Sequence, residues 1–336
     1  MVDVAVIGLG PVWDMRYLPA LQKLRNRIKV RALYDPVAAR SEQAAAEFDA
    51  DAVHSVIRLT RRFDIAALLL LDPGWIGLDL LHILKEARKP VYSSGSLGDD
   101  TDHLSRLHAE LQADGVTFMP EFSLRHTPAT ARLQELLATK LGRPVKIQIE
   151  AIVPSPDDPN LIPGQGPGTD FLVGLLDWCS YVVRTAPERL ESMPLERNER
   201  GECIDQLVRI EFKSSRGGGD PPVVELRIRH RRDEEHRADA VPQGQRVKHD
   251  LICERGHAHV RAPSEIIWQN GAEAVNESLT SERSEVEVML DHFCRRVVGG
   301  LIPVADVADV CRSIQLTRAI EESLRTNRAV PLNGKP

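Results

Sequence analysis

Short apolar runs alternate with amphipathic helical patterns along the first 120 residues of the chain. The apolar runs, which indicate strands, lie at residues 2–7, 29–34, 53–56, 65–71, 90–93 and 116–119. The helical patterns between them lie at residues 18–24, 38–48, 75–87 and 99–113. Continuous apolar strands that alternate with helices are typical of a parallel sheet buried on both faces. The pattern therefore predicts an N-terminal α/β domain.

The hydrophobic pattern changes near residue 120. Strand patterns with alternating apolar and polar positions follow at residues 145–153, 207–213, 223–230, 248–261 and 265–269. Helical patterns lie at residues 128–141, 169–183, 282–298 and 304–326. Because several of these strands are neighbours in sequence, the second sheet is predicted to be open and mainly antiparallel. We expect two domains, residues 1–120 and 121–336, with the last helix a candidate to pack back on the first domain.

Composition and charge narrow the class of protein. The chain has 336 residues, of which 42% are hydrophobic and 27% charged, and its net charge is −6. This balance is typical of a globular protein of two domains, and the lack of a basic domain argues against nucleic acid as a partner. The longest apolar run, residues 65–71, is too short to cross a membrane. The five scattered cysteines form no paired motif, which indicates a reducing cytoplasm and no zinc site.

A glycine loop connects the first strand to the first helix. Gly8 and Gly10 lie in the strand–turn–helix context that dinucleotide binding requires, where a glycine lets the backbone approach a pyrophosphate. Trp13 occupies the place of the third glycine, and Pro11 removes one backbone N–H. Asp35 ends the second strand, where it could accept a hydrogen bond from a ribose hydroxyl or cap the next helix. The two roles are compatible.

Eight segments, taken in order and spacing, resemble one known family. They lie at residues 4–13, 18–21, 71–75, 89–97, 122–128, 141–145, 168–177 and 316–332. Together they are similar to the glucose–fructose oxidoreductase, inositol dehydrogenase and rhizopine catabolism (Gfo/Idh/MocA) family. The resemblance implies an N-terminal Rossmann domain and a C-terminal α/β domain whose large open sheet mediates a homodimer or a dimer of dimers. It also implies NAD(P)-dependent oxidation of a sugar or polyol.

The resemblance assigns site residues by position. The residues implied to bind the cofactor are Gly8, Gly10, Val12, Asp35, Asp72, Pro73 and Ser94. The residues implied to contact a sugar-like substrate are Arg125 and Asp170. No metal is expected, because His257 and His259 share a strand face without an obviously paired carboxylate or thiolate.

Two departures from the family pattern bear on catalysis. The family's Glu-Lys-Pro segment, whose lysine is catalytic, becomes Ser94-Gly95-Ser96. The histidine of its Asp-x-x-x-His pattern becomes Gly174, although Asp177 remains one helical turn later on the same face. Hydride transfer from a hydroxyl needs a base within hydrogen-bond reach, and glycine supplies none.

Three residues are candidates for the missing base: Asp177, His126 and Glu121. Each also has an ordinary structural role, since Asp177 could be a hydrogen-bonding carboxylate within its helix and His126 could simply pack. Two hypotheses therefore stay open, an oxidoreductase with an unusual catalytic set and a pseudoenzyme that binds a nucleotide or sugar as a sensor. We expect NAD, or NADP, to bind weakly or not at all. NAD is preferred because the Asp35 carboxylate would repel a 2′-phosphate and no arginine follows it immediately.

Overall fold

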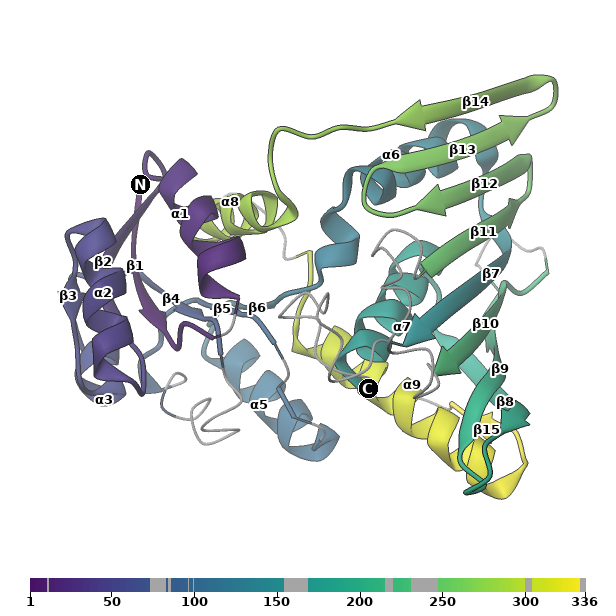
Figure 1. Cartoon of the computed structure of the whole chain (residues 1–336), viewed down its shortest axis with the longest axis horizontal. Helices are drawn as coiled ribbons and strands as arrows, with labels where there is room; N and C mark the ends of the chain where they lie inside the picture. Colours follow the sequence, from purple (N-terminus) through teal and green to yellow (C-terminus); the bar gives the residue numbers. More distant parts are fainter. Residues whose placement is uncertain are drawn as a thin grey trace. The chain divides into compact units, whose positions relative to one another are not determined.

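The computed structural model describes residues 1–10, 12–72, 83, 86–95, 97–98, 100–153, 169–214, 220–230, 247–299 and 304–332. The described residues divide into two compact units (Figure 1). The first unit contains those of Met1–Ser123 and Arg283–Cys311, and the second contains those of 124–153, 169–282 and 312–332. No helix in these ranges is long and apolar enough to cross a lipid bilayer.

The first unit is built on a parallel sheet. Its described strands are β1 (Val2–Ile7), β2 (Ile28–Tyr34), β3 (Asp51–Ala52), β4 (Ala67–Leu70), β5 (Val91–Ser93) and β6 (Phe118–Pro120). They lie in the order β3-β2-β1-β4-β5-β6, and every neighbouring pair is parallel. The direction in which strands are added reverses at β1, as in a doubly wound Rossmann sheet. The predicted N-terminal fold class is confirmed.

Helices from both ends of the sequence complete the first unit. They are the π-helical turn η1 (Trp13–Tyr17), α1 (Leu18–Lys23), α2 (Ala38–Phe48), α3 (Val56–Thr60), α5 (Thr101–Ala113) and α8 (Glu285–Val297). A capping box between Ser284 and Glu287 begins α8. Its apolar face, with Met289 and Phe293, joins the core formed by β1 and α1. The helix predicted at 75–87 lies almost entirely outside the described residues.

The second unit carries an open, mixed sheet. Its strands are β7 (Pro144–Val153), β8 (Pro187–Arg197), β9 (Cys203–Phe212), β10 (Val223–His230), β11 (Val247–Cys253), β12 (Gly256–Arg261), β13 (Glu265–Asn270), β14 (Glu273–Ser278) and β15 (Val330–Pro331). Their order is β14-β13-β12-β11-β7-β10-β9-β8-β15. Only the pair β7–β10 is parallel in this part of the chain, so the prediction of a mainly antiparallel sheet is confirmed.

One face of this sheet is covered and the other is charged. The remaining helical segments are η2 (Ser123–His126), α6 (Pro128–Leu136), η3 (Leu137–Leu141), α7 (Thr169–Val183) and α9 (Val307–Thr326). Side chains of α6, α7 and α9 share one apolar core with the inward residues of the strands. The opposite face carries ion pairs, among them Lys146–Glu225 at 2.8 Å and Arg227–Asp205 at 2.7 Å. The uncovered face of the sheet is therefore charged and not mainly apolar.

Candidate functional site

The glycine loop after β1 requires both of its glycines. Gly8 and Gly10 have φ angles of 70° and 65°, in the left-handed region that other residues rarely adopt. A Cβ at Gly10 would lie 3.2 Å from the Cβ of Asp72 and 3.3 Å from the carbonyl oxygen of Leu71. Asp72, two residues after the end of β4, thus lies beside the loop. Val12 is buried in the domain core, and Pro73 lies outside the described residues.

Asp35 braces the loop from the end of β2. Its Oδ2 accepts from the backbone N–H of Leu9 at 3.0 Å, and its Oδ1 accepts from the N–H of Val37 at 2.9 Å. The N-cap residue of α2 is Val37, so the interpretation of Asp35 as a helix cap was wrong. The carboxylate instead joins the glycine loop to the turn that precedes the helix.

Trp13 replaces the third glycine with a packed ring. The backbone widens to a π-helical turn over Trp13–Tyr17, and the indole lies buried with its ring centroid 6.1 Å from that of Phe48. A third glycine usually permits close packing of helix and strand, whereas here an aromatic pair fills that space.

A polar cluster lies at the carboxyl ends of β5 and β6. Glu121, whose side chain is 5% exposed, accepts on Oε1 from Arg16 Nη2 at 2.7 Å and from Ser123 Oγ at 2.7 Å. Its Oε2 accepts from the hydroxyl of Tyr17. Arg16 Nη2 also lies 3.2 Å from Glu285 Oε1 on α8. Both oxygens of this candidate base are therefore already engaged.

The environment of Glu121 favours its charged form. Burial alone would raise the pKa of its carboxyl group, but the charge of Arg16 and the hydroxyls of Tyr17 and Ser123 hold that pKa below its ordinary value. Burial and the neighbouring carboxylate raise the pKa of Tyr17 well above its ordinary value, so Tyr17 stays protonated and donates. Ser94, buried at the end of β5, donates its backbone N–H to the carbonyl of Leu70 at 2.8 Å. Glu121 is therefore a carboxylate anion that accepts hydrogen bonds from three side chains, those of Arg16, Tyr17 and Ser123.

In the second unit, two predicted site residues form a buried ion pair. Arg125 Nε donates to Asp177 Oδ2 at 2.8 Å, and its Nη2 donates to Oδ1 at 2.5 Å. The two side chains are 4% and 2% exposed, and the guanidinium carbon lies 4.9 Å from the ring centroid of Tyr181. Protonation of Asp177 would remove the charge that holds this bidentate pair. The arrangement resembles a structural clamp more than a free base.

The remaining candidates occupy partly exposed positions. His126 ends the short turn η2 and Asp170 lies in the first turn of α7, both half-buried. Gly174 lies in the same helix, and a Cβ there would have no atom within 4 Å apart from its neighbours and the nearby backbone of that helix. Gly95 is exposed and has a φ of 81°. Its backbone conformation therefore disfavours lysine or any other L side chain.

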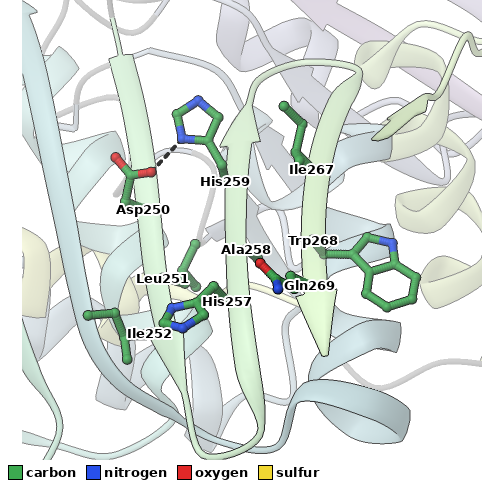
Figure 2. A pocket seen from close by; sticks show the side chains of 9 residues that line it. All are labelled: Asp250, Leu251, Ile252, His257, Ala258, His259, Ile267, Trp268 and Gln269. Carbon is green, nitrogen blue, oxygen red and sulfur yellow. Dashed lines mark hydrogen bonds and ion pairs between the residues drawn. The ribbon is translucent and has the colours of Figure 1, made fainter. Parts of the chain in front are cut away.

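A shallow hollow of about 200 Å³ lies on the exposed face of β11, β12 and β13 (Figure 2). In it, His259 Nδ1 lies 2.5 Å from Asp250 Oδ1, and His259 Nε2 accepts from Arg261 Nε at 3.1 Å. His257 lies further along the same strand. Among the described residues, no three histidine, cysteine or acidic side chains come together as metal ligands.

Sequence reasoning missed three arginine and tyrosine partners of the loop and cluster. They are Arg16, Tyr17 and Arg40. Arg40 was detectable in principle, because it lies near the start of the predicted helix that follows Asp35. Arg16 and Tyr17 had no such signal, since their partner Glu121 is more than 100 residues away in sequence.

The sheet order, the glycine loop and the acid at the end of β2 define a Rossmann-type dinucleotide-binding domain, here joined to an open-sheet α/β domain. Residues 2–91 match the oxidoreductase family with an NAD-binding Rossmann fold, GFO_IDH_MocA. This match agrees with the resemblance of the sequence motifs to the Gfo/Idh/MocA oxidoreductases. None of the curated proteins matches the chain.

Solved structures share the fold of the whole chain. An NAD-binding oxidoreductase from Klebsiella pneumoniae is 14% identical with a TM-score of 0.80, and the match covers 99% of this chain and 100% of that one. UDP-N-acetylglucosamine 3-dehydrogenase from Acidithiobacillus ferrooxidans is 15% identical with a TM-score of 0.76, over 96% and 98%. A mutant of the 3-ketoreductase KijD10 from Actinomadura kijaniata, in complex with TDP-benzene and NADP, is 17% identical with a TM-score of 0.72, over 96% and 98%.

Proposed function

We propose that this protein binds a nicotinamide dinucleotide at the edge formed by Gly8, Gly10 and Asp72, and that it acts within the class of sugar and polyol oxidoreductases. The observation that carries the proposal is the loop geometry, since a side chain at Gly10 would fill the space beside Asp72. The family description names NAD binding, and structural relatives include a nucleotide-sugar dehydrogenase and a ketoreductase with NADP. We expect weak binding, because Trp13 stands where a third glycine would.

The parts of the site follow from the strand order. A dinucleotide lies across the point where the sheet reverses, with its pyrophosphate at the loop after β1. In this proposal the backbone at Gly8, Gly10 and Val12 binds the pyrophosphate. Asp35 fixes the loop next to the place of the adenosine ribose. Asp72, Pro73 and Ser94 follow β4 and β5 on the nicotinamide side, where the cofactor would supply or accept a hydride. Arg125 and Asp170 are the proposed contacts of a sugar-like ligand.

Replacing Gly10 with alanine is expected to weaken binding of NAD and NADP at least tenfold. The new Cβ would press on Asp72 and Leu71 in a loop whose φ already disfavours alanine, at a cost of about 1–2 kcal/mol in folding stability. Titration of nucleotide against intrinsic tryptophan fluorescence measures the binding. Gly115→Ala is the matched control, because Gly115 has a φ of +66° and no neighbour within 4 Å of its Cβ. Equal loss of binding in both variants would contradict the proposal.

A second candidate function is a catalytically inactive sensor that keeps nucleotide or sugar binding without turnover. Two observations favour it. Every carboxylate oxygen of Glu121 and Asp177 already accepts a hydrogen bond from a side chain of the protein. The conformation of Gly95 is one that a lysine rarely adopts.

A cytoplasmic location is part of either proposal, and all five cysteines are free thiols, which suits a reducing compartment.

We also propose a homodimer, or a dimer of dimers, that pairs through the exposed face of the second sheet. Because ion pairs such as Lys146–Glu225 cover that face, the dimer is expected to weaken as salt rises. Light scattering at micromolar protein measures the mass in low salt and at about 1 M salt, where the Debye length falls to about 3 Å. A monomer at both salt concentrations would count against the interface, and a dimer insensitive to salt would point to another surface.

A further inference from the structure

An exposed arginine lies where the glycine loop meets the second strand. Arg40 is the third residue of α2, and its side chain is 44% exposed. Its Nη2 donates to the carbonyl oxygen of Gly10 at 2.7 Å, and its Nη1 lies 3.7 Å from Asp35 Oδ2. The guanidinium group has five N–H donors, so these contacts leave donors for a ligand. The exposed charge at this end of β2 is therefore positive.

The acidic residue at the same place is turned inward. The side chain of Asp35 is 3% exposed, and each of its oxygens accepts a backbone N–H, from Leu9 and from Val37. A carboxylate that selects NAD must be exposed to the ribose hydroxyls in order to accept from them. The Asp35 carboxylate is instead almost fully buried against the backbone of Leu9 and Val37, and Arg40 Nη1 lies 3.7 Å from it. The expected repulsion of a 2′-phosphate by Asp35 is thereby reduced.

We propose that Arg40 makes this loop select NADP over NAD, through the 2′-phosphate of the adenosine ribose. The inference rests on the proposed dinucleotide site and reverses the preference expected from the sequence. A phosphate at the end of β2 accepts charge-assisted hydrogen bonds from the free edge of the Arg40 guanidinium. NAD has only a hydroxyl at that position and gains no such bond. Bonds of this kind correspond to about 10- to 100-fold in affinity.

Direct binding measurements test the proposal without turnover. Calorimetry compares NADP with NAD, and adenosine 2′,5′-bisphosphate with AMP, on the full-length protein. The unmodified protein is expected to bind each 2′-phosphorylated ligand at least tenfold more tightly than its partner. Arg40→Ala is expected to abolish that difference, with the affinity for NAD and AMP changing less than threefold. Arg40→Lys retains the charge but not the planar fork, so it should keep part of the preference.

A second arginine of the same unit serves as the control. Arg25 is also exposed and donates to a backbone carbonyl, that of Glu47 at 2.9 Å, so Arg25→Ala should leave all four affinities unchanged. Equal loss of NADP and NAD binding in Arg40→Ala would overturn the proposal, because the arginine would then only support the loop. Tighter binding of NAD to the unmodified protein would also overturn it. Binding of neither dinucleotide at millimolar concentration would instead remove the proposed function on which it rests.

Discussion

Oxidation of common sugars and polyols by the unmodified protein, with NAD or NADP, is expected to be undetectable or very slow. A general base contributes on the order of 10²–10⁴ in rate, and Gly95 and Gly174 stand where the sequence resemblance implies a catalytic lysine and histidine. Glu121 and Asp177 do not replace them freely, because their oxygens already accept hydrogen bonds from arginine. The absorbance of reduced nicotinamide, followed with a panel of substrates, measures the rate.

Restoring the two groups separates their contributions. Gly174→His is expected to fold normally, since a Cβ there meets nothing within 4 Å beyond its neighbours and the nearby helix backbone, and histidine is a better helix former than glycine. Gly95→Lys alone is expected to lose about 1–2 kcal/mol in stability, given its φ of 81°, and to restore no activity. The double variant is the fairer test of rescue. Ordinary enzymatic rates in the unmodified protein would refute the inactive-sensor proposal, and single substitutions of Asp177, His126 and Glu121 would then locate the base.

Removing one partner of the buried Arg125–Asp177 pair is expected to lower the free energy of unfolding by about 3–5 kcal/mol. Asp177→Asn keeps the side-chain volume but leaves the guanidinium, which is 4% exposed, without its charged partner. The double variant Arg125→Met with Asp177→Leu removes both charges and should recover much of the loss, because apolar pairs often replace buried ion pairs at little cost. Denaturant unfolding followed by circular dichroism measures all three proteins.

An exposed ion pair of the same unit provides the comparison. Lys140 and Glu273 lie 2.8 Å apart with side chains 39% and 52% exposed, so Glu273→Gln should cost about 0–1 kcal/mol. If Asp177→Asn costs no more than this, the carboxylate is less constrained than the structure indicates. Asp177 would then return as a candidate base, so the stability measurement also bears on catalysis.

The parts of the fold visible in the sequence were those with strong local patterns. The run of residues 2–7 is almost wholly apolar because β1 is covered on both faces, and α2 and α7 were predicted at their observed bounds. The strand β8 was missed, because Pro187 and Pro194 interrupt a charged segment. Beyond Leu190, β8 pairs only with β9 in the described structure, which is the edge position where a strand proline is tolerated. The strand β14 was also missed, because most of its residues are polar. It lies at the other edge of the sheet.

The candidate site was predictable in its motif and not in its partners. The loop glycines and Asp35 were found from their context, but the direction of the Asp35 carboxylate depends on backbone N–H groups that a residue pattern does not specify. The Arg125–Asp177 pair joins residues 52 positions apart, and the Arg16–Glu121 pair joins residues 105 apart. Long-range pairing of this kind leaves no periodic trace in one sequence. This pairing nonetheless determines whether a carboxylate can act as a general base or serves a structural role.

The return of α8 to the first unit sets an order of events during synthesis. Phe293 packs its ring 5.9 Å from that of Tyr92, Met289 lies in the same core, and Glu287 pairs with Lys23 at 3.0 Å. A nascent chain ending near residue 123 contains the described strands of the parallel sheet, β1 to β6, but not α8. The core of the first unit is therefore expected to lack α8 until the strands β7 to β14 have been translated and the helix leaves the ribosome.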